Sequence, residues 1–244
     1  MKKIALVLFI LTSSLFILKA QRYYLYGEAS AGGHGGDGVL FRFDPFTGKD
    51  SVLFNFNGLN GSEPARDLYL SQNGLLYGGC EFGGSKNKGV LFSYNLNNGR
   101  ENTLVDFSDS NGSNFAWGST LYKGILYGTT ALGGAYNDGI IFSYNPNNNK
   151  DSVVFNFNDT DGSAAYGGLF VLNDTSFFGM TEYGGTNNVG VLYSLNPLTS
   201  KEKVLINFNK STTGGWTQGG LIKAPNGLLY GMTGEFGPGG GSII

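Results

Sequence analysis

The sequence repeats itself about every fifty residues. An aromatic residue followed by glycine marks one point of each repeat. These aromatics follow one another at spacings of 51, 50, 51 and 52 residues: Tyr26, Tyr77, Tyr127, Phe178 and Tyr230. A period of this length is typical of a solenoid or a propeller, in which each unit buries its faces only against its neighbours. The chain therefore has to fold as a stack of similar units.

Each repeat contains four short runs with the composition of β-strands. In one repeat these runs read GGLFVLND, FFGMTEYGG, GVLYSLNP and KVLINFN, and each is rich in β-branched and aromatic residues and closed by turn residues. In the third run, Val39, Phe41 and Phe43 share one face, as expected for a small sheet packed between neighbours. Four short antiparallel strands per fifty residues are typical of a β-propeller blade.

We therefore predict an all-β fold, a β-propeller of four-stranded antiparallel blades over residues 21–244. Repeats begin near residues 25, 76, 126, 177 and 229, giving about four complete repeats and a partial fifth. The last repeat reads GPGGGSII where the others continue with a third strand. We expect an incomplete or open ring, and interpret the chain as a truncated copy of a longer protein with further blades and a C-terminal anchoring segment.

Composition excludes some classes of protein. The 41 glycines recur at fixed places among 19 Phe and 14 Tyr, so they indicate turns and not a flexible linker. A net charge of −2 provides no basic stripe for phosphates, which argues against a nucleic-acid partner. The single cysteine, Cys80, can form no internal disulfide. Other repeats place a small residue at its position, so we interpret Cys80 as a buried filler and not as a nucleophile.

The first twenty residues have the pattern of a secretory signal peptide. MKK supplies positive charge, residues 4–18 form an apolar run, and Ala20 offers a small residue before Gln21. The run is shorter than the roughly 20 residues of a membrane span, so we expect no membrane-spanning segment in the chain after cleavage. An uncleaved anchor is the alternative, because Leu18 is larger than the residue preferred near a cleavage site. The prediction is a secreted or cell-surface protein.

The repeat pattern resembles a known family. The glycine doublets at 83–84, 133–134 and 184–185, followed by GVLF, GIIF and GVLY, are similar to the choice-of-anchor tandem repeat called GloVer, found in exported bacterial proteins. The resemblance spans residues 25–244 and implies a propeller-like fold and export, without implying an activity. The pattern also resembles kelch blades, but it lacks their regular Trp after the third strand.

Neither a metal site nor a cofactor site is predicted. His34 is the only histidine, in the glycine-rich stretch 32–38, and a metal site or catalytic triad needs several positioned groups. The same stretch precedes no helix, which argues against nucleotide binding. The loops 108–113 and 158–163 look acidic, but their spacing does not match an EF-type calcium loop, so we interpret them as turns. We predict no catalytic residues.

Carboxylates recur in one column of the repeat. Glu81, Glu182 and Glu235 each precede an aromatic residue and a glycine, whereas Ser30 and Ala131 break the series. In a propeller these carboxylates should lie near one end of the channel, where they could bind a cation or a cationic ligand. A solvated loop end is the simpler interpretation.

Aromatic residues vary in the connection from each fourth strand to the next first strand. This connection carries four candidate ligand-binding residues: Phe115, Trp117, Tyr166 and Trp216. Connections of one type gather on one rim of a propeller, so these rings could form a platform for a sugar or a protein partner. They could equally fill gaps between blades.

Two classes of function follow. The first is an exported, non-catalytic binding module whose ligand is a carbohydrate or a protein. The second is an extracellular hydrolase or lyase acting on polysaccharide, with residues such as Glu81, Glu182 and His34. The fold does not decide between them, since propellers host both. The sequence favours the binding module, because it offers no non-repeated polar constellation.

Overall fold

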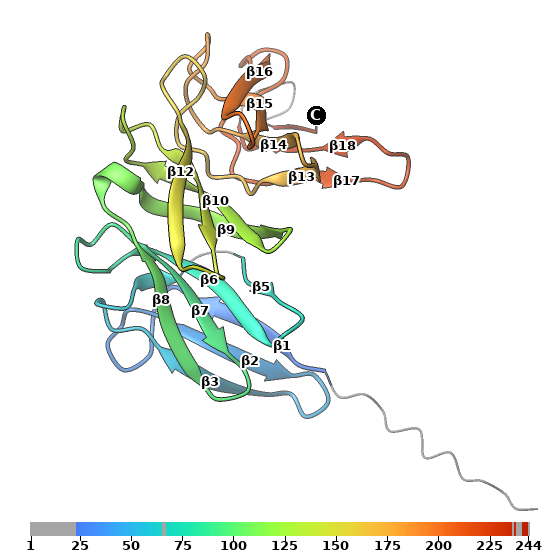
Figure 1. Cartoon of the computed structure of the whole chain (residues 1–244). Helices are drawn as coiled ribbons and strands as arrows, with labels where there is room; N and C mark the ends of the chain where they lie inside the picture. The colour runs from blue at the N-terminus through green and yellow to red at the C-terminus, as the bar shows by residue number, and fades with distance from the viewer. Residues whose placement is uncertain (1–22, 65–66, 236, 238–240, 244) are drawn as a thin grey trace, which may run out of the picture.

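The structure is a computed structural model of the chain, and it describes residues 23–64, 67–235, 237 and 241–243 (Figure 1). The predicted signal peptide, residues 1–20, lies outside the described residues. None of the described stretches forms a helix with the length and apolar character needed to cross a bilayer.

The strands form five successive units, which we call blades 1 to 5. Blade 1 contains β1 (Leu25–Ala29), β2 (Val39–Asp44) and β3 (Lys49–Asn55). Blade 2 contains β4 (Ser62–Pro64), β5 (Tyr69–Leu70), β6 (Leu75–Phe82), β7 (Val90–Asn95) and β8 (Arg100–Asp106). A short 3-10 helix, η1 (Asp109–Asn111), follows.

The later blades repeat this order. Blade 3 contains β9 (Ser113–Tyr122), β10 (Ile125–Leu132), β11 (Ile140–Asn145) and β12 (Lys150–Asn156). Blade 4 contains β13 (Phe170–Asn173), β14 (Ser176–Met180), β15 (Val191–Asn196) and β16 (Lys201–Asn207). Blade 5 contains β17 (Ile222–Lys223), β18 (Leu229–Tyr230), β19 (Met232–Thr233) and β20 (Ser242–Ile243).

The architecture is that of a β-propeller arranged as an open arc, as predicted. Strands pair antiparallel inside each blade, and blades 3 and 4 are each one four-stranded sheet in chain order. The three strands of blade 1 correspond to the second, third and fourth strands of those blades. In blade 2, β4 and β5 both pair with β6, and blade 5 forms two two-stranded sheets. Among the described residues, no strand pairing joins blade 1 to blade 5. Figure 1 shows the blades in chain order, from the blue sheet at the bottom to the orange and red strands at the top.

The aromatic–glycine pair has a packing reason in blades 1 to 4. A ring from the third strand lies over the glycine of the second strand, so closely that a side chain there would collide with it. The four pairs are Gly27 with Phe41, Gly78 with Phe92, Gly128 with Phe142 and Gly179 with Tyr193. Glycine is therefore required at this position because the ring from the third strand of the same blade leaves no room for a side chain.

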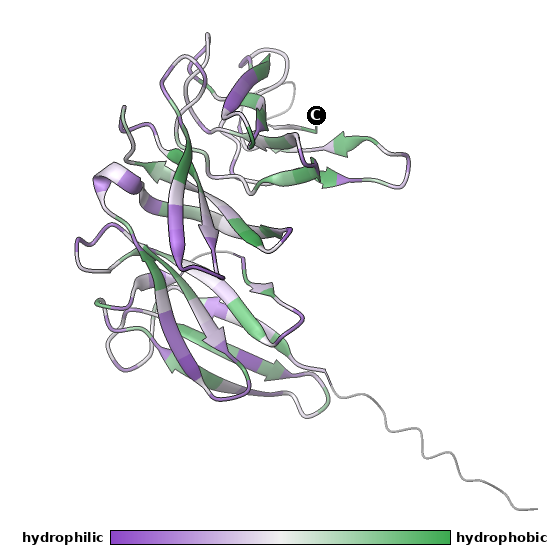
Figure 2. Ribbon diagram, viewed as in Figure 1, coloured by the Kyte–Doolittle hydropathy of each residue, from purple (hydrophilic) through white to green (hydrophobic). Residues whose placement is uncertain are grey.

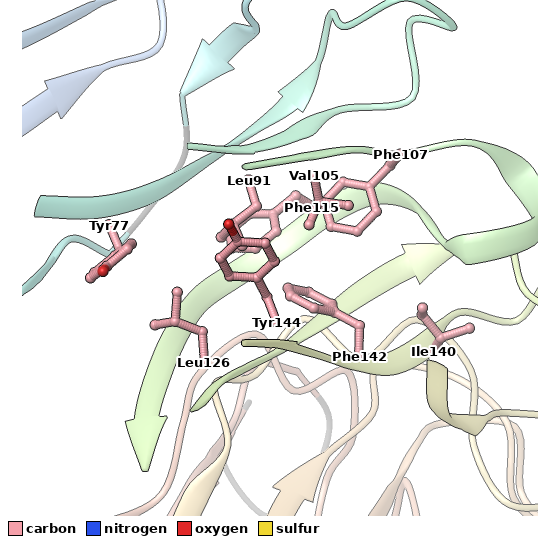
Figure 3. Packing of buried hydrophobic residues seen from close by; sticks show 9 residues of the cluster. All are labelled: Tyr77, Leu91, Val105, Phe107, Phe115, Leu126, Ile140, Phe142 and Tyr144. Carbon is pink, nitrogen blue, oxygen red and sulfur yellow. The ribbon is translucent and has the colours of Figure 1, made fainter. Parts of the chain in front are cut away.

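The core lies between blades. One cluster joins Phe107 of blade 2 to Phe115 and Phe142 of blade 3, and Figure 3 shows these rings grouped together with Leu91 and Tyr144 beside them. Similar clusters fill the other interior joints. Hydrophilic stretches lie on the outer strands β8, β12 and β16, which have many exposed positions (Figure 2). Each blade thus depends on its neighbours for burial.

A backbone hydrogen bond ties each blade to the one before it. The N–H of a residue with positive φ donates to a carbonyl in the loop between β-strands two and three of the preceding blade. The four bonds are Glu63 to Asp37 (3.0 Å), Asn114 to Lys88 (2.8 Å), Ala164 to Asp138 (3.1 Å) and Trp216 to Val189 (3.1 Å). We call these four donor residues the joint residues.

The glycine doublets have positive φ, and they are anchored by side chains. Gly83, Gly133 and Gly184 each donate their N–H to the side-chain oxygen of an asparagine four residues later. A further N–H of each loop bonds a side chain at the end of the fourth strand of the same blade. These bonds join His34 to Asn55, Ser85 to Asp106, Ala135 to Asn156 and Thr186 to Asn207. The polar residues that recur in each repeat therefore fix the loop conformation through hydrogen bonds.

Candidate functional site

Five side chains gather where blades 4 and 5 meet, and we call them the rim cluster. They are Tyr166, Glu182, Tyr183, Trp216 and Glu235. The rings of Tyr183 and Trp216 meet edge to face, with their centroids 6.3 Å apart and an angle of 63° between their planes. Tyr183 forms a hydrogen bond with the side chain of Glu182. It also interacts electrostatically with Tyr166 and Glu235, which are therefore near it.

Backbone pairing fixes the carboxylates and the rings. In blade 4, Ser163 bridges Tyr183, and the N–H of Glu182 donates to the carbonyl of Ala164 at 3.0 Å. In blade 5, Gly215 and Glu235 exchange two backbone hydrogen bonds of 2.9 and 3.2 Å. The same turn is therefore used twice, once in each blade, and it brings Tyr183 and Glu235 to equivalent positions.

Trp216 is a joint residue with a bulky side chain. It has φ of 55°, a conformation that a large side chain rarely adopts, and the equivalent residue of blade 4 is Ala164. Its ring packs partly against Met180, Val189 and Phe208. The hydrogen bond to Val189 and this packing hold the ring in place, so the strained backbone presents a fixed aromatic surface.

The electrostatics of the cluster centre on Tyr183. A hydrogen bond to the Glu182 side chain raises the pKa of Tyr183, and burial and the negative charge of Glu182 raise it further. Tyr183 is 40% exposed and Glu235 is exposed, whereas Glu182 is buried. The cluster therefore offers solvent an aromatic face with carboxylate oxygens beside it.

This arrangement fits binding better than bond cleavage. Aromatic rings pack against apolar faces of a ligand, and carboxylates accept hydrogen bonds from its hydroxyl or amine groups. A glycosidase needs one carboxyl positioned as acid and another as base or nucleophile. Here Glu182 is engaged with its neighbour Tyr183, so the carboxyl contributes to holding that ring.

The structure brings only some of the candidate aromatics together. Tyr166 and Trp216 belong to the rim cluster. Phe115 is 1% exposed and lies inside the core, 6.2 Å from the ring centroid of Phe107, so it takes no part in the cluster. Trp117 lies in β9, paired with Thr129, and its side chain lies outside the described part of the chain.

The structure also brings only some of the candidate carboxylates together. Glu182 and Glu235 belong to the rim cluster, whereas Glu81 is half-buried near the end of β6 in blade 2. His34 is exposed in the loop of blade 1, and its backbone N–H donates to Asn55. The described residues show no contact that joins His34 to Glu81 or Glu182.

The described residues contain no group of three or more His, Cys, Asp or Glu side chains that could hold a metal ion. The loop 158–163 is a turn held by its own side chains: Asp161 accepts from the N–H of Asn158 at 2.8 Å, and Asn158 accepts from that of Thr160 at 3.1 Å. The loop 108–113 contains η1 and is held similarly, through Ser108 and Asn111. Cys80 is buried, and burial raises the pKa of its thiol.

Comparison with known families decides the identity of the repeat. The model of the Gloeobacter/Verrucomicrobia repeat matches residues 13–125 and again residues 118–244. The chain belongs to this repeat family. The resemblance to GloVer repeats inferred from the glycine doublets is thereby confirmed. No curated protein matches the sequence.

Solved structures with similar folds are distant in sequence. A chain of a nidogen/laminin complex has a TM-score of 0.55 and 11% identity, covering 86% of this GloVer chain and 68% of that chain. TolB from Acinetobacter baumannii gives 0.55 and 16%, with coverages of 91% and 52%. The extracellular domain of a hybrid two-component system from B. thetaiotaomicron gives 0.56 and 14%, with coverages of 93% and 28%. The GloVer chain thus spans about half of TolB.

Sequence reasoning missed Tyr183, the exposed ring at the centre of the cluster. It follows Glu182 in the motif EYG, and its counterparts Phe82 and Phe236 made it look like part of the repeat scaffold. The signal was present in the hydroxyl group, because Tyr is the only member of this column that can bond the neighbouring carboxylate.

Proposed function

We propose that this GloVer chain is an exported, non-catalytic binding module that holds carbohydrate at the rim cluster. The observation that carries the proposal is the pair of Tyr183 and Trp216, whose rings are fixed against each other beside two carboxylates. Sugar rings have apolar faces that pack on aromatic rings, and hydroxyl groups that donate to carboxylates.

The repeat fold supports an interaction module in a general way. A propeller presents loops of neighbouring blades on one rim, where side chains from several blades can contact one ligand. One structure of similar fold comes from a nidogen/laminin complex, a crystal structure of two proteins bound to each other. For the GloVer chain, the mixture of exposed ring and carboxylates favours a sugar, and a protein ligand is the other outcome of a binding screen.

The proposal includes export, on the strength of the first twenty residues. Their charged start, apolar run and small residue at position 20 match a secretory signal peptide. Expression in a bacterial host followed by N-terminal sequencing of the extracytoplasmic fraction tests it. A mature chain that begins near residue 21 supports export, whereas a chain that still begins at Met1 contradicts it.

A glycan microarray probed with the purified chain tests the ligand class. We expect binding to a restricted set of oligosaccharides, and loss of that binding in Tyr183→Ala. Tyr136→Ala is the matched control, because Tyr136 is 63% exposed on a loop of blade 3 and has no place in the rim cluster. Retention of glycan binding by Tyr183→Ala, or loss in both variants, contradicts the assignment of the site.

A further inference from the structure

A second site lies away from the rim cluster, at the inner edge of the arc. An open cavity of about 400 Å³ is lined there by the first strands of blades 2 to 5 and the segments just before them. A volume of this size is in the range of small-molecule sites. Its wall exposes backbone at Gly118, Gly168 and Gly220, so a ligand can approach the chain closely there.

We call this the axial cavity, and its two ends differ in polarity. Leu169, Leu221 and Ile222 form an apolar wall on blades 4 and 5. Asp67 of blade 2 and Ser119 of blade 3 form the polar end. Asp67 packs against Gly118 so closely that a methyl group on Gly118 would lie 2.4 Å from the Asp67 Cβ atom. Any larger residue at position 118 would collide with the Asp67 side chain, so glycine is needed there.

The polar end contains a hydroxyl group without a hydrogen-bond partner among the described residues, and a second group of this kind lies outside the cavity lining. Ser119 is only 7% exposed, and its hydroxyl makes no hydrogen bond among the described residues. Behind Asp67, both carboxyl oxygens of Glu28 are buried and also lack partners in the described part of the chain. A buried polar group without a partner is costly, and such groups commonly mark a place for a ligand, an ion or water.

Glu28 lies against blade 2, close enough to Asp67 for their charges to interact. Its Oε1 atom would lie 2.6 Å from a methyl group built on Gly78, which places the carboxyl in the joint between blades 1 and 2. The charge of Asp67 contributes to raising the pKa of Glu28. Among the described residues that line the cavity, Asp67 is the only charged one and none is basic.

We propose that the axial cavity binds a cationic nitrogen carried on a short apolar chain. The nitrogen donates to the Asp67 carboxylate and to the Ser119 hydroxyl, and the apolar chain lies against Leu169, Leu221 and Ile222. Two sources offer this chemistry, a free alkylamine and a lysine side chain of a peptide. The interaction involves no residue of the rim cluster, so it stands independently of glycan binding.

The test compares probes that differ only in charge. Hexylammonium and hexan-1-ol are titrated into the purified chain, and binding is followed by the amide NMR signals of Gly118, Gly168 and Gly220. We expect hexylammonium to bind at least about tenfold tighter than hexan-1-ol and to move these three signals. Equal affinity of the two probes, or shifts confined to amides elsewhere, overturns the proposal.

Variants then identify the acid and the second acceptor. Asp67→Asn should remove the preference for the charged probe, and Ser119→Ala should weaken hexylammonium binding severalfold. Asp50→Asn, which neutralises an exposed acid on β3, should change nothing. A preference that survives in Asp67→Asn overturns the proposal. Because the glycine shifts are read in the unmodified chain, the proposal is testable even if a variant fails to fold.

A peptide pair separates the two sources. A short peptide with one central lysine is compared with the same peptide carrying norleucine at that position. Tighter binding of the lysine peptide than of hexylammonium identifies a protein ligand, and the reverse identifies a free amine. If the norleucine peptide binds as well as the lysine peptide and hexan-1-ol as well as hexylammonium, charge is not recognised and the proposal is wrong.

Discussion

The ring of Phe142 lies over Gly128 so closely that a methyl group on Gly128 would sit 2.6 Å from the Phe142 Cζ atom. Gly128 belongs to β10 and Phe142 to β11, and the two residues are direct partners in the strand register. The same contact recurs in blades 1, 2 and 4. The aromatic–glycine motif of the sequence is therefore explained by a steric contact between two neighbouring strands.

The first prediction concerns this contact. Gly128→Ala should lower the free energy of unfolding by about 2 kcal/mol, because the added methyl group overpacks the ring of a core residue. Phe142→Leu in the same background should recover part of that loss, although alone it is destabilising through the volume it removes. Denaturant unfolding of the two single variants and the double variant measures the coupling. Strict additivity would show that the ring does not require the glycine.

The second prediction concerns the joint residues. Ala164 has φ of 54°, where an L-residue with a Cβ atom is strained by roughly 1 kcal/mol or more and glycine is not. Ala164→Gly should therefore stabilise the chain by about 1 kcal/mol in thermal or denaturant unfolding.

The control for this prediction is the next residue. Ala165 is also buried but is not among the residues with positive φ, so Ala165→Gly should destabilise through added backbone entropy and lost packing. If both substitutions destabilise equally, positive φ at position 164 is not the source of strain.

The third prediction concerns Glu28. Burial, with the charge of Asp67 adding to it, raises the pKa of Glu28 from 4.5 to about 8. Between these values the folded chain holds a proton that the unfolded chain releases. Stability should therefore be highest below about pH 4.5 with respect to this group, and should fall as the pH rises toward 8, by roughly 2 to 4 kcal/mol.

Unfolding measured across this pH range in the parent and in Glu28→Gln checks the effect. The glutamine variant removes the titrating group, so its stability should depend less on pH over the same interval. Asp67→Asn should reduce the slope partly, because it removes the smaller of the two causes. An identical pH profile in the parent and in Glu28→Gln would show that Glu28 does not titrate in this range.

Recurrence in the sequence predicted the parts of the fold that every blade needs. The paired glycines, the strand alternation and the small side chain at Cys80 are all consequences of one blade packing on another, so they repeat and can be recognised. The resemblance to GloVer repeats depended on the same residues, and the family match confirms it.

The candidate site was predicted less well, because it depends on departures from the repeat. Phe115 was grouped with the rim aromatics, but β9 pairs with β10 through two register shifts near Thr129, and Phe115 lies inside the core. Glu28 was missed because its column holds Gly79, Thr129 and Met180 in other blades. A single acidic residue in an otherwise apolar or small column leaves no recurring pattern, and only burial in the folded chain reveals it.

The most direct measurement is a binding titration of an oligosaccharide selected on the microarray. It compares the parent chain, Tyr183→Ala and Tyr136→Ala by isothermal calorimetry, with thermal unfolding of each chain as a check of folding. Binding at the rim cluster predicts that Tyr183→Ala weakens affinity about tenfold or more, through the loss of aromatic packing, while its unfolding temperature stays within a few degrees of the parent. Affinity unchanged in Tyr183→Ala, or lowered equally in Tyr136→Ala, would contradict a ligand site at the rim cluster.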